Sequence, residues 1–232
     1  MWYRYEIHMH SKEGSKCGQA PLADLVRAYH AARYAGGVLT DHFIFGNTAI
    51  PRDLPWEEQM QGYYDAYLSA KEVADELDFD LIFGIEHQYG NFKEILIYGM
   101  DVDFWKANPD IPEIDVHELA ERVHAAGGYI SHAHPFRFKS YMTHYVDPTV
   151  DMVDALEVYN YSDSDESNAK AKALAEKMGL PGTGGGDTHW ADSEGIGQAG
   201  IALPYRVHDT KELAQAMHKG DFRPIVCGEI VE

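Results

Sequence analysis

Five short segments of the sequence place His, Asp or Glu directly after an apolar, strand-like run. In a strand, residues i and i+2 point to the same side, so His-x-His and Asp-x-His each aim two side chains at one point. The carboxyl ends of parallel strands are where α/β folds build their active sites. The fold must therefore gather these five segments at one edge of a sheet: Ile7-His8-Met9-His10, Leu39-Thr40-Asp41-His42, Gly84-Ile85-Glu86-His87, Ser131-His132-Ala133-His134-Pro135 and Gly186-Asp187-Thr188-His189.

Strand-like and helix-like segments alternate along the chain. This alternation predicts one α/β domain over residues 1–232, with a mostly parallel sheet covered by helices. Periodicity alone does not separate a closed barrel from an open sheet. We expect strands at 3–8, 38–40, 81–83, 94–98, 129–131, 155–158, 182–183, 200–203 and 224–226, and helices at 21–34, 57–78, 115–126, 165–178 and 209–219.

The charge balance narrows the class of partner. The chain has 19 Lys and Arg against 38 Asp and Glu, a formal net charge of −19, which disfavours long nucleic acid and anionic membranes. It has two cysteines, Cys17 and Cys227, and no apolar run of membrane-spanning length. These features favour a soluble cytoplasmic protein in a reducing compartment.

The recurring residue types indicate metal binding. Isolated histidines are usually surface or core residues, and we interpret those outside the five segments in that way. Within the segments, imidazole and carboxylate occur together without a thiolate, a combination that suits Zn, Mn or Fe. The ligands exceed what one ion can use, so we expect two or three divalent ions with a bridging carboxylate.

Taken together and in order, the five motifs resemble the PHP (polymerase and histidinol phosphatase) superfamily along the whole chain. The resemblance implies an irregular seven-stranded (β/α) barrel with a trinuclear metal site at the carboxyl end of the strands. Asp41 would orient a ligand from outside the site. The implied ligands are His8, His10, Glu86 and Asp187 for one ion, Glu86 and His134 for a second, and His42, His189 and the loop residue Glu13 for a third.

One position departs from the family pattern. Many relatives carry a further His on the strand after the Gly-x-Glu motif, where this chain has Leu96. His87 and His132 are candidates to compensate for it. Alternation favours His132, because residues 132 and 134 of an extended segment project to the same side.

The resemblance implies a metal-dependent phosphoesterase. We expect hydrolysis of a small-molecule phosphomonoester by a metal-bridging hydroxide, with Asp187, His189 and Arg137 as catalytic residues; histidinol phosphate is the family's best-known substrate. The planar guanidinium of Arg137 suits a phosphate group. Two alternatives remain open: a phosphodiesterase or exonuclease on short nucleic acids, and a non-catalytic metal-binding regulatory module.

Overall fold

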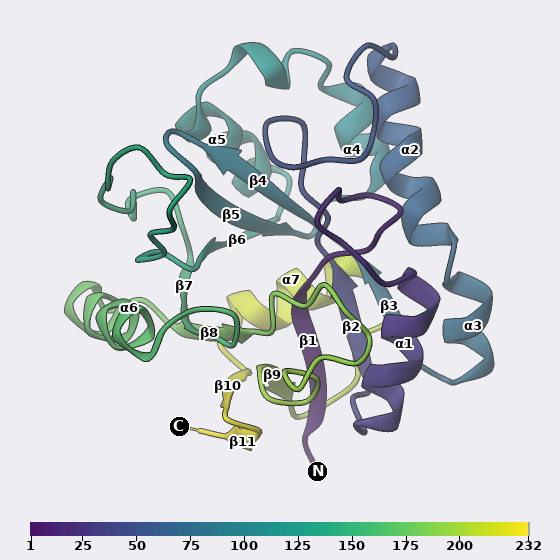
Figure 1. Cartoon of the computed structure of the whole chain (residues 1–232), viewed down its shortest axis with the longest axis vertical. Coiled ribbons are helices and arrows are strands. Elements are labelled where there is room, and N and C mark those ends of the chain that lie inside the picture. The colour runs from purple at the N-terminus through teal and green to yellow at the C-terminus, as the bar shows by residue number, and fades with distance from the viewer. Residues whose placement is uncertain (232) are drawn as a thin grey trace.

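A computed structural model describes residues 1–231, whose strands form two mixed sheets (Figure 1). The first has the order β11-β10-β9-β1-β2-β3 and the second the order β4-β5-β6-β7-β8. The strands are β1 (Tyr3–Met9), β2 (Gly36–Leu39), β3 (Asp80–Phe83), β4 (Ile85–Tyr89), β5 (Lys93–Tyr98), β6 (Tyr129–Ala133), β7 (Ala155–Asn160), β8 (Gly182–Gly185), β9 (Gly200–Leu203), β10 (Arg223–Val226) and β11 (Glu229–Ile230).

The predicted seven-stranded (β/α) barrel is wrong, because the strands of residues 1–231 form these two sheets and no closed barrel. Parallel pairing runs through β1–β2–β3 and through β6–β7–β8. A turn at Gly90 joins β4 directly to β5, and β5 is antiparallel to both β4 and β6. A hairpin needs no crossover helix, so it interrupts the strand–helix alternation of the (β/α) barrel that the family resemblance implied.

Helices cover the sheets, and one predicted helix is divided. In place of a single helix over 57–78, two helices are separated at Ser69 and Ala70, where the Ser69 hydroxyl donates to the carbonyl of Ala66 (2.6 Å). Such local side-chain bonds compete with helix continuation. The helices are α1 (Leu22–Ala31), α2 (Trp56–Leu68), α3 (Lys71–Glu76), α4 (Val102–Ala107), the 3-10 turn η1 (Ile111–Glu113), α5 (Val116–Ala125), α6 (Asp165–Met178) and α7 (Thr210–His218). Among the described residues, none of these helices has the length and apolarity needed to cross a membrane.

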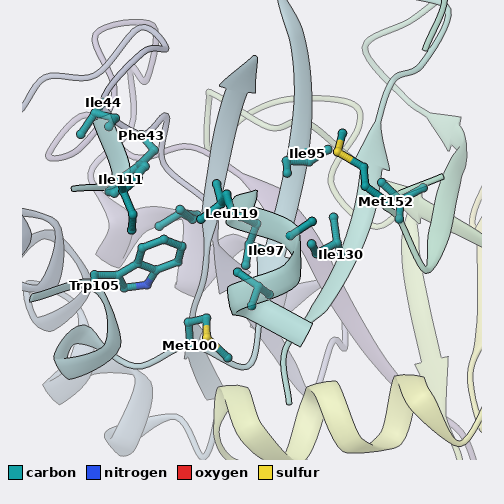
Figure 2. Close-up of a cluster of buried hydrophobic side chains, with 14 of the residues drawn as sticks. Phe43, Ile44, Ile95, Ile97, Met100, Trp105, Ile111, Leu119, Ile130 and Met152 are labelled. Carbon is teal, nitrogen blue, oxygen red and sulfur yellow. The ribbon is translucent and has the colours of Figure 1, made fainter. Parts of the chain in front are cut away.

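Strand β5 separates two hydrophobic clusters. Ile95 and Ile97 pack with Trp105 in one cluster (Figure 2), whereas Leu96 and Tyr98 belong to a second cluster with residues of β1. The Tyr98 hydroxyl donates to the carbonyl of Ile7 on β1 (2.9 Å). Because strand residues alternate in direction, the even-numbered side chains of β5 face the first sheet.

The five predicted segments meet where the two sheets approach each other. Isolated parallel bridges join His42 to Glu86 and Met9 to Thr188, linking the ends of strands that belong to different sheets. The backbone amide of His10 also donates to the carbonyl of Thr188 (2.9 Å). The ends of strands from both sheets therefore lie close together, although the strands form no closed barrel.

Truncating the core beside β5 should destabilise the fold. The Ile97 side chain is 1% exposed, and removing a buried aliphatic side chain typically costs about 2–5 kcal/mol. We expect Ile97→Ala to lower the free energy of unfolding by that amount in urea denaturation. The control Met178→Ala removes a side chain that is 47% exposed and should change it by less than about 0.5 kcal/mol. Equal effects of the two substitutions would contradict this description of the core.

Candidate metal centre

Seven predicted ligands converge on the Glu86 carboxylate and its surroundings. Glu86 Oε1 lies 3.1 Å from His8 Nε2 and 3.0 Å from His134 Nε2, and Glu86 Oε2 lies 2.7 Å from His42 Nδ1. Asp187 Oδ1 lies 3.3 Å from His10 Nε2. The His10 and His189 rings are 4.7 Å apart between centroids. Side chains from both sheets thus build one continuous cluster.

The cluster divides into overlapping groups of potential ligands. In each group the donor atoms lie within 4.8 Å of one another. The groups share Glu86, His8, His10 and His42, so neighbouring ions could be bridged. The groups are His8, His10 and Asp187; His8, Glu86 and His134; His42, Glu86 and Glu94; and His10, His42 and His189.

Unpaired donor atoms show that the cluster fits divalent cations. Within residues 1–231, four of its buried atoms have no hydrogen-bond partner: His8 Nε2, His10 Nε2, His42 Nδ1 and Glu86 Oε2. Leaving such an atom unsatisfied in a dry interior costs about 1–3 kcal/mol. Cations would satisfy these atoms together and would also neutralise the carboxylates.

The protonation states favour the same interpretation. Burial raises the pKa of Glu86, but His42 and His8 outweigh burial and hold the pKa well below its ordinary value. Burial also raises the pKa of Asp187, and Arg137 and His8 reverse this effect. Burial lowers the pKa of His10 to about 3. At neutral pH the two carboxylates are therefore charged and His10 is neutral, the forms in which these groups bind metal.

Glu157 orients two of the clustered residues from outside. Its Oε1 lies 2.9 Å from His8 Nδ1, and its Oε2 accepts the His134 amide (2.8 Å) and the Asn160 side chain (2.9 Å). With Nδ1 donating to Glu157, the imidazole of His8 presents Nε2 to the cluster. Partners of this kind fix the tautomer of ligating histidines.

Glu6 joins β1 to the loop that carries Asp187. Its buried carboxylate accepts the amides of His8 and Gly186 (2.8 Å each) and the Tyr29 hydroxyl (2.8 Å). Burial outweighs these bonds and raises the pKa of Glu6 to about 7. A Cβ at residue 186 would lie 2.7 Å from Glu6 Oε2, so glycine is needed for this close approach.

Two predicted site residues, Asp41 and Glu13, lie apart from these groups. Asp41 accepts the hydroxyls of Ser11 and Ser15 (2.7 Å each), and the Ser15 hydroxyl in turn accepts the His42 amide (3.0 Å). Asp41 is thus placed to hold the loop after β1. The Glu13 carboxylate accepts the Leu22 amide (3.1 Å) at the start of α1.

The structure does not bring His132 to the cluster. Its Nε2 lies 2.7 Å from the Tyr89 hydroxyl and its Nδ1 lies 2.9 Å from the Ala133 carbonyl oxygen. The alternation argument fails because β6 ends at Ala133 and His134 has a φ of 27°, outside the extended region. Residues 132 and 134 therefore do not share a side.

Glu94 was missed by the sequence interpretation. Its Oε1 lies 3.3 Å from His42 Nδ1 and its Oε2 lies 3.4 Å from His134 Nε2. The signal was available, because Glu94 is two residues before Leu96 on the same strand and so shares its side. Cys17 also lies beside the cluster: burial raises the pKa of its thiol, but hydrogen bonds with His189 and His42 outweigh burial and lower that pKa to about 7.

A cavity of about 720 Å³ opens over the cluster. Glu94, Asp187 and His189 of the cluster line this cavity. Cationic and aromatic side chains line the rest of its wall. Arg137 lines it while its guanidinium contacts Asp187 Oδ2 (2.6 Å) and donates to Asn160 Oδ1 (3.1 Å). The other cations are Lys16, Arg52 and Lys139, and the aromatic side chains are Phe45, Phe92, Tyr141 and Trp190.

The fold and the cluster together define an α/β protein whose clustered His and carboxylate side chains are compatible with divalent metal ions. A model of the PHP-associated family (PHP_C) matches residues 165–222. No curated protein matches the sequence significantly. The matched residues include Asp187 and His189 of the cluster, so the family match covers the C-terminal part of the candidate site.

Solved structures share the fold at low sequence identity. A two-domain protein from Bacteroides vulgatus that contains a predicted PHP-like metal-dependent phosphoesterase is 13% identical, with a TM-score of 0.70, over 100% of this chain and 67% of that one. A candidate metal-dependent phosphoesterase from Bifidobacterium adolescentis is 15% identical (TM-score 0.57; 94% and 96% covered). A lesion-specific endonuclease from Pyrococcus furiosus is 13% identical (TM-score 0.62; 97% and 58% covered).

Removing the charge of Glu157 should weaken metal binding without removing a ligand. Substitution of such outer partners typically lowers metal affinity about 10–100-fold, and we expect Glu157→Gln to do so in equilibrium dialysis against Mn²⁺ or Zn²⁺. Glu166→Gln is the control, because Glu166 pairs with Lys170 on the exposed face of α6. Wild-type affinity in Glu157→Gln would show that His8 needs no such partner.

Proposed function

We propose that this chain is a metal-dependent phosphoesterase that hydrolyses a small-molecule phosphomonoester. The observation that carries the proposal is the buried His and carboxylate cluster at the floor of a cationic cavity. Within residues 1–231, four of its buried donor atoms have no hydrogen-bond partner, and the pKa values of Glu86 and Asp187 lie well below the ordinary range of carboxylates. A cavity of about 720 Å³ suits a small molecule. Divalent ions held by this cluster would supply an activated water and would neutralise charge on phosphoryl oxygens.

The residues around the cluster would bind and orient the phosphate. Arg137 presents a planar, permanently charged group beside Asp187, and such a group forms paired hydrogen bonds with phosphate oxygens. Arg52 donates to the carbonyls of Ile44 (2.6 Å) and Gly46 (2.5 Å), so it supports the cavity wall. His189 Nδ1 lies 2.8 Å from the Asp187 carbonyl oxygen, which leaves its Nε2 to bind an ion or to transfer a proton.

The proposal requires that activity follow metal content. We expect chelation to abolish phosphomonoester hydrolysis and Mn, Zn or Fe to restore it, as measured on a panel of phosphomonoester, phosphodiester and dinucleotide substrates. Elemental analysis confirms each metal state. Full activity in excess EDTA after verified metal removal would overturn the proposal. A fully loaded protein that hydrolyses none of the substrates would favour the non-catalytic metal-binding module.

The aromatic side chains at the cavity favour a second candidate, a phosphodiesterase on short nucleic acids. Tyr141 and Trp190 are 60% and 53% exposed, and Phe45 is 45% exposed. Stacking of a base on an aromatic ring contributes about 1–3 kcal/mol. Faster cleavage of dinucleotides than of phosphomonoesters in the same panel would support this candidate.

Arg137 provides a separate test of phosphate binding. Losing a hydrogen bond to a charged group costs about 1.5–3 kcal/mol, so we expect Arg137→Ala to lower kcat/KM by about 10–100-fold, with a raised KM. Arg137→Lys keeps the charge but loses the planar fork and should recover part of the activity. Arg122→Ala is the control, because Arg122 pairs with Asp110 and Glu118 away from the cavity. Unchanged kinetics in Arg137→Ala would assign Arg137 to structural support of Asp187.

A further inference from the structure

We infer that Glu94 is a metal ligand that completes a site between His42 and His134. The inference deepens the proposed function, because it names a residue that determines how one ion of the cluster is held. The Glu94 carboxylate lies between the imidazoles of His42 and His134. Its Oε1 is 3.3 Å from His42 Nδ1, and its Oε2 is 3.4 Å from His134 Nε2. With Glu86 and His42 it forms one of the groups whose donors lie within 4.8 Å of one another.

The position of Glu94 is fixed by strands on both sides. Its backbone is opposite Gln88 on β4 and Ala133 on β6, so β5 cannot shift without breaking both pairings. Glu86 on β4 is opposite Leu96, which makes Glu94 its diagonal cross-strand neighbour. Long side chains in this relation can reach one another. The two carboxylates therefore converge on the same imidazole from adjacent strands.

Two carboxylates compete for the same imidazole nitrogen beside Glu94. Within residues 1–231, its ion-pair partners are His42 and His134, and no Lys or Arg lies within ion-pair distance. His42 Nδ1 faces both Glu94 and Glu86, at 3.3 and 2.7 Å. One imidazole can donate only one proton from this nitrogen, so His42 Nδ1 cannot hydrogen-bond to both carboxylates at once. The side chain of Glu94 is 11% exposed, which limits compensation by solvent.

A ligand set with two carboxylates differs from the other groups of the cluster. The group of His10, His42 and His189 offers imidazole alone, whereas Glu86 and Glu94 add hard oxygen donors beside His42. Carboxylates suit Mn²⁺, and imidazole suits Zn²⁺. The ion at Glu94 should therefore be the one that the protein takes up most readily as Mn²⁺.

Metal binding measured without substrate tests the inference. We would determine bound Mn²⁺ by elemental analysis after dialysis at a series of free Mn²⁺ concentrations. The variant Glu94→Gln keeps the shape of the side chain and removes its charge. We expect it to lose one equivalent of Mn²⁺, or to bind that equivalent at least about tenfold more weakly, while the remaining ions stay bound. Circular dichroism confirms that the variant is folded.

Two further variants serve as controls. Glu229→Gln removes a carboxylate from β11, away from the cluster, and should retain the wild-type stoichiometry. His132→Asn tests the rival ligand and should also retain it, because His132 faces Tyr89. Wild-type Mn²⁺ stoichiometry and affinity in Glu94→Gln would overturn the inference, as would a wild-type protein that binds no Mn²⁺. Loss of one equivalent in a protein without phosphoesterase activity would uphold Glu94 and overturn the proposed function.

Discussion

The arrangement of this molecule depends on burying two carboxylates where the sheets meet. Glu86 is fully buried and Asp187 is 3% exposed. An ionised carboxylate in a low-dielectric interior is unfavourable unless positive charge and hydrogen bonds offset its desolvation. Arg137 contacts Asp187 at 2.6 Å, whereas Glu86 is surrounded by imidazoles. The strand ends therefore converge on a position that needs cations, and the hairpin of β4 and β5 holds Glu86 there.

Much of the cluster could be predicted from the sequence, because each ligand follows an apolar strand. The rule that strand ends share an edge does not depend on how the strands pair, so it brought His8, His42, Glu86 and Asp187 together. The barrel was expected from the family resemblance, and the periodicity of the strands could not correct it, because periodicity says nothing of parallel or antiparallel pairing. The antiparallel β5 beside β4 and β6 decides the topology.

The predicted residues that lie apart from the cluster do so for local physical reasons. His132 was expected there because alternation was extended past the end of β6, where the backbone at His134 leaves the extended region. Glu13 was chosen from a loop, and no periodicity constrains the direction of a loop side chain; its carboxylate contacts the start of α1. Glu94 and Leu96 share one side of β5, so strand alternation from Leu96 identifies Glu94 as a residue that faces the cluster.

Two residues of the cluster have a backbone conformation that side chains disfavour. His134 has a φ of 27° and Asp187 a φ of 48°, and a left-handed conformation of a residue with a Cβ costs about 1–3 kcal/mol. The rest of the fold must hold this strain, and ligands that bind the native state alone offset it. With metal bound as proposed, the resistance of the chain to unfolding would be coupled to the supply of metal around it. In a metal-poor environment, the segments around His134 and Asp187 would then lack one contribution that offsets their backbone strain.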